Sequence, residues 1–323
     1  MPDANLLLVG FVKCGTTSLS MHLAAHPDIS TPAIKELYHL IDSSSPLTSM
    51  RPAVSRQIGN GNGHLPNQSA RSYSEHFPIE NRRYALDATP WYYSQETAFR
   101  YATCNPGVKT IFMLRNPVRR IVSSYRFFQG MLQEYPAGSF TEFVEALLDE
   151  HDTKGGYRMR IRKDFFKYAF DSELDMGCYE QHISKWLSAI GEKRVFIGKM
   201  EDLRDDPKRL MIRLCSFLDL DPGIYSEFDF AAYFQSYNVR FGFLQKMGRR
   251  LAREDPMRYD RLGQTHSPFH PIAGHRTRRL FERVYRTLQE RQDRIESRAI
   301  DLLTEFYRPH NVRLRERFSI DYV

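Results

Sequence analysis

The stretch Leu6-Leu7-Leu8-Val9-Gly10-Phe11-Val12-Lys13-Cys14-Gly15-Thr16-Thr17-Ser18-Leu19 decides the fold of this chain. Its apolar run, its loop bounded by two glycines and its following segment predict a strand, a tight loop and a helix. In that arrangement backbone N–H groups converge on an anion, and the positive end of the helix dipole faces it. We therefore expect a phosphate-binding loop here, rather than a strand-to-helix turn with chance glycines.

The loop keeps the glycine frame of a Walker A nucleotide site but not its ending. A Walker A loop continues Gly-Lys-Ser/Thr, and its lysine reaches the γ-phosphate. Here Gly15 is followed by Thr16-Thr17, and the lysine stands inside the loop at Lys13. The sequence thus predicts an anion cradle without the lysine of a nucleoside triphosphatase.

The composition is that of a folded protein with a basic surface. The 323 residues are 41% hydrophobic and carry a formal net charge of +7. Such a length allows one large or two modest domains. Because there is no internal repeat and no clear boundary, we expect a single domain over residues 1–323. The basic balance favours anionic ligands, acidic polymers or membrane surfaces without choosing among them.

Several sequence signals are absent. No run of eighteen or more apolar residues occurs, so no transmembrane helix is expected. The N-terminus enters the first predicted strand directly, which leaves no room for a signal peptide. Cys14, Cys104, Cys178 and Cys215 show neither CxxC nor metal-site spacing. We expect free thiols, no metal and a cytoplasmic protein.

Strands and helices alternate along the predicted chain. The expected strands are Asn5–Gly10, Arg83–Asp87, Val108–Leu114 and Arg194–Ile197. The expected helices are Thr17–Ala25, Pro117–Phe128, Phe140–Glu150, Tyr179–Ala189, Pro207–Leu218 and Arg276–Tyr307. This alternation predicts an α/β fold, P-loop-like and three-layered, with a central parallel sheet flanked by helices. Residues 43–76, 151–172 and 221–275 read as loop-rich or irregular.

A second candidate anchor follows the strand that ends at Leu114. It reads Arg115-Asn116-Pro117-Val118-Arg119-Arg120-Ile121-Val122-Ser123-Ser124-Tyr125. Arg115 stands at the carboxyl end of the strand, where parallel sheets bind ligands. Ser123 lies two turns along the next predicted helix, so we expect it to converge with Arg115 on one anion. A guanidinium fork with a hydroxyl is suited to phosphate.

Together the two segments resemble the sulfotransferase family, whose donor is 3′-phosphoadenosine 5′-phosphosulfate (PAPS). The 5′-phosphate loop of the family, Lys-x-Gly-Thr-Thr-Ser-Leu, is matched from Lys13 to Leu19, and its 3′-phosphate motif from Arg115 to Tyr125. Further matches are Gly177-Cys178-Tyr179, Lys199-Met200-Glu201-Asp202-Leu203 and the ending Tyr307-Arg308-Pro309-His310-Asn311. The subgroup most resembled contains heparan-type and bacterial carbohydrate sulfotransferases.

The resemblance implies roles for particular residues. It implies that PAPS binds at Lys13, Cys14, Gly15, Thr16, Thr17, Ser18, Arg115 and Ser123, and that adenosine 3′,5′-bisphosphate (PAP) is the product. Lys13 is then expected to stabilise the leaving 5′-phosphate. In Lys35-Glu36-Leu37-Tyr38-His39, Glu36 is the implied general base, with His39 as the rival because histidine titrates nearest neutrality. The implied chemistry needs no metal.

The sequence departs from the family at two places. Heparan-type members carry a lysine where Ala88 stands in Asp87-Ala88-Thr89-Pro90. The family's late Lys-Gly-Arg loop is not recognisable; Lys246, Arg249 and Arg250 are the alternatives there, and a solvated basic helix is the plainer interpretation of them.

Two other functions remain in competition at this point. A P-loop kinase or nucleoside triphosphatase would account for the glycine frame, but the Walker lysine and a Walker B aspartate are missing. A non-enzymatic basic binding protein would account for the charge. For a sulfotransferase the acceptor could be a small molecule, a lipid headgroup or a carbohydrate. Nucleic acid is not expected as a partner, and no oligomeric state is predicted.

Overall fold

The computed structural model describes residues 3–32, 35–50, 73–77, 82–131, 139–153, 161, 164–230 and 297–322. These residues fall into two compact units. The first unit holds the described residues up to Arg115 and those from Tyr179 to position 230. The second holds those from Asn116 to Cys178 and the C-terminal range 297–322. Each unit is described by itself.

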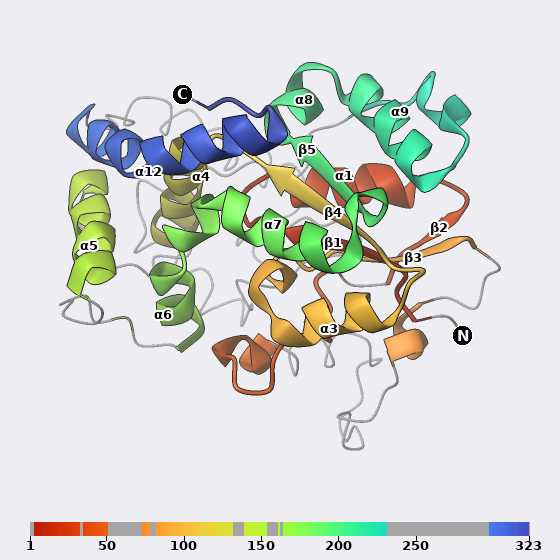
Figure 1. Cartoon of the computed structure of the whole chain (residues 1–323), viewed down its shortest axis with the longest axis horizontal. Coiled ribbons are helices and arrows are strands. Elements are labelled where there is room, and N and C mark those ends of the chain that lie inside the picture. The colour runs from red at the N-terminus through yellow and green to blue at the C-terminus, as the bar shows by residue number, and fades with distance from the viewer. Residues whose placement is uncertain are drawn as a thin grey trace, which may run out of the picture. The chain divides into compact units, whose positions relative to one another are not determined.

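The first unit is built on a five-stranded parallel sheet in the order β2-β3-β1-β4-β5. Its strands are β1 (Leu6–Gly10), β2 (Ile29–Ser30), β3 (Tyr84–Asp87), β4 (Lys109–Leu114) and β5 (Val195–Lys199). Figure 1 shows β1 and β4 side by side in the middle of this sheet. Every residue of β1 and β3 is buried, as expected for parallel strands that are covered on both faces. The expectation of an α/β fold with a central parallel sheet is confirmed.

Helices cover both faces of the sheet. The helices of this unit are α1 (Thr16–Ala24), α3 (Glu96–Cys104), α7 (Tyr179–Ile190), α8 (Met200–Asp205) and α9 (Pro207–Leu218). Phe112 and Met113 are successive residues of β4, so their side chains point to opposite faces. Phe112 contacts Trp186 of α7, whereas Met113 and Leu210 of α9 both pack against Gly198. The two helices therefore lie on opposite faces, which gives three layers.

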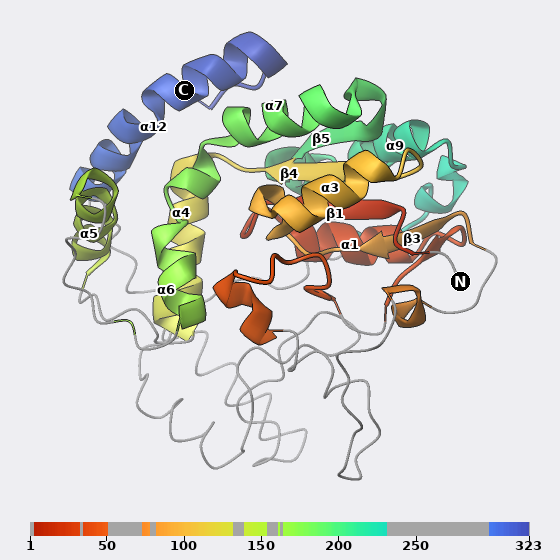
Figure 2. The same cartoon turned by 60° about the horizontal axis from the view of Figure 1, so that its bottom comes forward.

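The described part of the second unit is helical. It contains α4 (Pro117–Tyr125), α5 (Phe140–Thr153), α6 (Asp164–Asp171) and α12 (Ser297–Phe318). Figures 1 and 2 both place α12, in blue, next to α5, and α12 also contacts α4. Phe143 of α5 is buried against Tyr125 and Phe170, so an aromatic cluster joins α4, α5 and α6.

Several predicted boundaries need correction. The predicted helix Pro117–Phe128 ends at Tyr125 and continues as a π-helical turn over Arg126–Met131. Helix α6 lies in a segment that was expected to be irregular, and α3 and α8 were not predicted. Short 3-10 turns, Pro46–Met50 and Tyr73–His76, lie within the predicted loop 43–76.

The last helix was expected to end at Tyr307, but it continues through Pro309 to Phe318. Its continuation is explained by burial, because Tyr307, Asn311 and Leu314 share one buried face. The earlier part of that predicted helix, and Lys246, Arg249 and Arg250, lie outside the described residues.

Candidate functional site

The predicted phosphate loop joins β1 to α1. The backbone N–H of Phe11 donates to the carbonyl of Met113 on β4 (3.1 Å), and that of Cys14 donates back to Phe11 (3.2 Å). Gly15 stands at the N-cap of α1 with a φ of 80°. Lys13 also has a left-handed φ, 66°, so the loop turns sharply on each side of Cys14. Thr16, Thr17 and Ser18 form the first turn of the helix, where backbone N–H groups point toward an anion.

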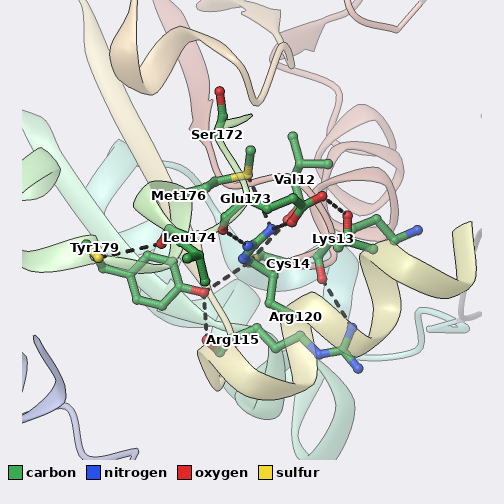
Figure 3. Close-up of polar contacts among 12 residues, drawn as sticks. Val12, Lys13, Cys14, Arg115, Arg120, Ser172, Glu173, Leu174, Met176 and Tyr179 are labelled. Carbon is green, nitrogen blue, oxygen red and sulfur yellow. Dashed lines mark hydrogen bonds and ion pairs between the residues drawn. The ribbon is translucent and has the colours of Figure 1, made fainter. Parts of the chain in front are cut away.

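Arg115 is joined to this loop. Its Nη1 donates to the carbonyl of Lys13 (3.2 Å), and the hydroxyl of Tyr179 donates to the carbonyl of Arg115 (2.8 Å). The same hydroxyl lies 3.7 Å from Cys14 Sγ, and Figure 3 draws Cys14, Tyr179 and Arg115. The structure thus brings Lys13, Cys14 and Arg115 together, although they come from two strands. Cys14 is buried, so it fills space beside the loop.

Ser123, the other predicted phosphate ligand, lies on α4 in the second unit and is buried. That helix begins at Pro117, and the side chain of Asn116 caps it by accepting from Arg119 N (3.1 Å). Proline in the first turn and an Asn cap explain why the helix begins here. Next to Ser123, Ser124 donates to the carboxylate of Glu173.

Glu36 stands in a segment held by polar contacts on both sides. Lys35 Nζ lies 2.5 Å from Glu36 Oε1, and the hydroxyl of Tyr38 donates to Glu36 Oε2 (2.7 Å). The side chain of Glu36 is 16% exposed. Glu36 and Tyr38 both have left-handed φ angles, 66° and 53°. Such angles are uncommon for residues with a Cβ and cluster at functional sites.

His39, the rival base, is held by ring contacts. Its imidazole stacks on Tyr73 with 4.3 Å between centroids and 5° between the planes. A second histidine, His76, lies edge-on at 5.9 Å. The structure therefore packs His39 against an aromatic ring, while Glu36 is bonded to a cation and a phenol.

Asp87, which was not predicted as a site residue, is the buried acceptor of a hydrogen-bond network that contacts this segment. Its carboxylate accepts hydrogen bonds from Tyr73 (2.6 Å), Tyr92 (2.8 Å) and Thr89 (2.6 Å). Burial raises the pKa of Asp87, and the three hydroxyl donors oppose that rise. Burial, followed by the charge of Asp87, raises the pKa of both tyrosines well above the ordinary value, so they stay protonated as donors. The segment Asp-Ala-Thr-Pro-Trp-Tyr holds Asp87, Thr89 and Tyr92, so it is the sequence signal that could have revealed this network.

A buried ion pair with its hydrogen-bond partners, also not predicted from the sequence, lies in the second unit. Arg120 Nη1 lies 2.9 Å from Glu173 Oε2, and both side chains are buried. Arg120 also donates to the carbonyl of Glu173, and the hydroxyl of Tyr307 donates to the carbonyl of Leu174 (2.9 Å). Figure 3 draws the Arg120–Glu173 pair with Met176 beside it. This cluster fixes α4, the helix that carries Ser123.

The parallel sheet gathers the candidate residues of the first unit at one edge. The phosphate loop follows β1, the Glu36 segment follows β2, Asp87 ends β3 and Arg115 follows β4. All four positions lie at the carboxyl ends of neighbouring strands, where open α/β sheets bind their ligands. Among the described residues no group of three or more His, Cys, Asp or Glu could hold a metal ion, and no described helix could cross a membrane.

The sequence matches known proteins along most of its length. The model of the sulfotransferase domain family matches residues 3–237. Human carbohydrate sulfotransferase 15 is 25% identical over 254 residues, which cover 68% of this chain and 44% of that protein. Mouse bifunctional heparan sulfate N-deacetylase/N-sulfotransferase 4 is 26% identical over 260 residues, covering 78% of this chain and 27% of that protein. The chain thus spans less than half the length of these relatives.

A solved structure shares the fold. The sulfotransferase from Alicyclobacillus acidocaldarius superposes with a TM-score of 0.53 at 21% identity, covering 78% of this chain and 93% of that one. The family match extends over more than two thirds of the chain and includes the phosphate loop and Arg115. This chain belongs to the sulfotransferase domain family.

Proposed function

We propose that this chain is a PAPS-dependent sulfotransferase that transfers the sulfuryl group to a hydroxyl or amine of a carbohydrate. One observation carries the proposal. A lysine-bearing anion loop, an arginine bonded to that loop and a carboxylate held by two partners all follow neighbouring strands at one edge of a parallel sheet. Sulfuryl transfer needs these three elements: a site for phosphate, a cation for the leaving group and a base.

The residues of the first loop fit a phosphate-bearing donor. The left-handed Gly15 and the first turn of α1, with Thr16, Thr17 and Ser18, offer N–H groups and hydroxyls. Lys13 is half-buried beside this turn and supplies a positive charge for the oxygen that leaves sulfur. Arg115 supplies a guanidinium for a second phosphate. We keep Cys14 and Ser123 in the proposed donor-binding set because they stand in the two sequence motifs that resemble the family.

Glu36 is the proposed general base. It accepts the proton of the acceptor as the acceptor oxygen or nitrogen bonds to sulfur and the bond from sulfur to the 5′-phosphate oxygen breaks. Like phosphoryl transfer, this in-line step depends mostly on positioning and charge stabilisation. Lys35 and Tyr38 each contact one of the two carboxylate oxygens, and these contacts hold the Glu36 side chain in one orientation. The stack of His39 on Tyr73 favours Glu36 over His39 as the base.

The acceptor class rests on the relatives. The names of both relatives reported above refer to carbohydrate or heparan sulfate sulfation. We therefore place a carbohydrate hydroxyl or amine ahead of a lipid headgroup or another small molecule.

An acceptor panel with ³⁵S-labelled PAPS tests this proposal. The panel contains N-desulfated heparin, heparosan, chondroitin, a glycolipid and p-nitrophenol, and each is scored for label that co-purifies with the acceptor after PAPS has been removed. We expect transfer to at least one polysaccharide, with Lys13→Ala lowering turnover about 100-fold or more. Lys193→Ala is the matched control, because Lys193 is an exposed lysine of the same unit.

Three results would overturn parts of the proposal. Transfer only to p-nitrophenol or the glycolipid would contradict a carbohydrate acceptor. Magnesium-dependent ATP hydrolysis without sulfuryl transfer would favour a P-loop nucleoside triphosphatase. Salt-sensitive polysaccharide binding without label transfer, unchanged in Lys13→Ala, would favour a non-enzymatic binding protein.

A further inference from the structure

We infer that Asp87 and Tyr38 are positioning residues for Glu36: the buried carboxylate of Asp87 fixes the backbone of the Glu36 segment, and Tyr38 fixes the Glu36 side chain. The inference deepens the proposed function and rests on it for the role of Glu36. It assigns a role to three buried hydroxyl groups and to a buried carboxylate that the proposed chemistry itself does not use.

The first step of the argument is the contact between Tyr38 and Glu36. The two residues are two positions apart, and the phenol reaches the carboxylate at 2.7 Å. Both residues have left-handed φ angles, so the backbone curls and directs both side chains to one side. Since such backbone is costly for residues with a Cβ, the surrounding structure must hold it.

The second step is the contact between that backbone and two hydroxyl oxygens. The N–H of Leu40 donates to Tyr92 Oη (3.1 Å), and the N–H of Tyr38 donates to Thr89 Oγ1 (3.5 Å). An amide can donate to a hydroxyl oxygen most favourably when the hydroxyl proton is directed elsewhere. Here both protons are directed at Asp87.

The third step is the burial of Asp87. Its side chain is fully buried, as are those of Thr89 and Tyr92. A carboxylate without water is stable only when its oxygens are satisfied, and Asp87 Oδ1 and Oδ2 receive three hydroxyl donors. Tyr73, the third donor, also stacks on His39. Through its three hydroxyl donors, Asp87 is therefore linked to the segment at three successive positions, 38, 39 and 40.

Amide hydrogen exchange tests the network without any acceptor. In Tyr92→Phe and in Asp87→Asn we expect exchange at the Leu40 amide to accelerate about tenfold or more, because a buried hydrogen bond is lost. Tyr84→Phe is the matched control. Tyr84 lies on β3, the strand that ends at Asp87, and its hydroxyl donates to the carbonyl of Leu218 (2.9 Å). The variant therefore also loses a buried tyrosine hydrogen bond, but one outside the network. Equal exchange at Leu40 in all four proteins would overturn the network.

Turnover with the preferred acceptor of the panel tests the role in catalysis. We expect Tyr38→Phe and Thr89→Val to lower kcat about tenfold while PAP affinity stays within about twofold, because the phosphate loop is untouched. Thr89→Ser keeps the hydroxyl and should restore most of kcat. A purely structural role would instead weaken PAP binding and transfer together, and Thr89→Ser would give no rescue.

The two readouts separate the failure of this inference from that of the proposed function. Wild-type kcat in Tyr38→Phe, with Glu36→Gln inactive, overturns the inference and keeps Glu36 as the base. If exchange at Leu40 accelerates in Tyr92→Phe and Asp87→Asn while Glu36→Gln is fully active, the hydrogen-bond network is supported, but it does not position a general base. Absence of transfer by the wild type with every acceptor overturns the proposed function, while the exchange experiment still decides the network.

Discussion

Gly15 is the position where a single methyl group should damage the phosphate loop most. Its φ of 80° suits glycine, and a Cβ built there would lie 2.3 Å from Met200 Sδ and 3.2 Å from Leu203 Cδ2. Left-handed backbone costs alanine about 1–2 kcal/mol. Moving the Met200 side chain costs about 1–3 kcal/mol, as overpacked cores do. Gly15→Ala should therefore lower the free energy of unfolding by about 2–5 kcal/mol.

The assay for Gly15→Ala combines urea unfolding with calorimetric titration of PAP. We expect the midpoint of unfolding to fall and PAP affinity to drop about tenfold or more, because the loop must shift to relieve the contact. Gly107→Ala is the matched control: a Cβ at Gly107 meets nothing within 4 Å. That variant should stay within about 1 kcal/mol of the wild type.

A double variant separates the two costs at Gly15. Adding Met200→Ala to Gly15→Ala should recover the steric part of the loss, measured as a coupling energy of about 1–3 kcal/mol against the two single variants. The backbone part should remain. Wild-type stability and wild-type PAP affinity in Gly15→Ala would refute the assignment of this loop geometry.

Three further predictions concern buried groups. Glu173→Gln leaves the buried Arg120 charge without its counterion, so urea unfolding should show a loss of about 3–5 kcal/mol; a loss below about 0.5 kcal/mol, the size expected for a surface change, would contradict the pair. Cys104 is the exposed cysteine, and burial raises the pKa of Cys178 to about 12, so Ellman's reagent should label Cys104 fast in the native protein, and Cys104→Ser should remove that phase. Burial raises the pKa of Asp87 above 3.8, so the stability due to that group is present below pH 3.8 and is lost as the pH rises through its folded pKa. Urea unfolding should show Asp87→Asn gaining stability relative to the wild type over that pH interval; a relative gain for the wild type would reverse the sign of the shift.

The elements that the sequence predicted best are those with local signals. Helix α9 has the predicted bounds, Pro207–Leu218, because Pro207 suits its first turn and Asp206 caps it by accepting from Arg209 N (3.0 Å). The strand and loop before α1 were predicted on equally local grounds, an apolar run and two glycines. Such signals act over a few residues, so a single sequence displays them in full.

Helix α3 was missed because its cap comes from elsewhere in the chain. Its first amides, those of Glu96 and Thr97, donate to the carboxylate of Asp42 (3.0 and 2.7 Å), while Gln95 at the N-cap makes no side-chain cap bond. Asp42 lies more than fifty positions earlier, so no local pattern around Gln95 could reveal the cap. The structure alone shows this helix start.

The residues of the candidate site also fall into two groups, those with a local sequence signal and those held by residues distant in the sequence. The motif around Lys13 and Gly15 and the arginine at the end of β4 were visible, since phosphate binding uses a short contiguous pattern. Asp87 was invisible as a network centre because its donors include Tyr73, fourteen positions away, and the segment that it holds lies some fifty positions earlier. The assignment of Ser123 to the donor site stays a prediction, as does the division of labour between Glu36 and His39.

The rate of sulfuryl transfer by Glu36→Gln tests the central claim most directly. The measurement is single-turnover transfer of ³⁵S from PAPS to the preferred acceptor of the panel, with PAP affinity determined on the same preparation. Glu192→Gln, at an exposed glutamate of the same unit, is the control. A lost general base predicts a rate lower by about 100-fold or more with PAP affinity unchanged. Transfer by Glu36→Gln at the wild-type rate would contradict the account.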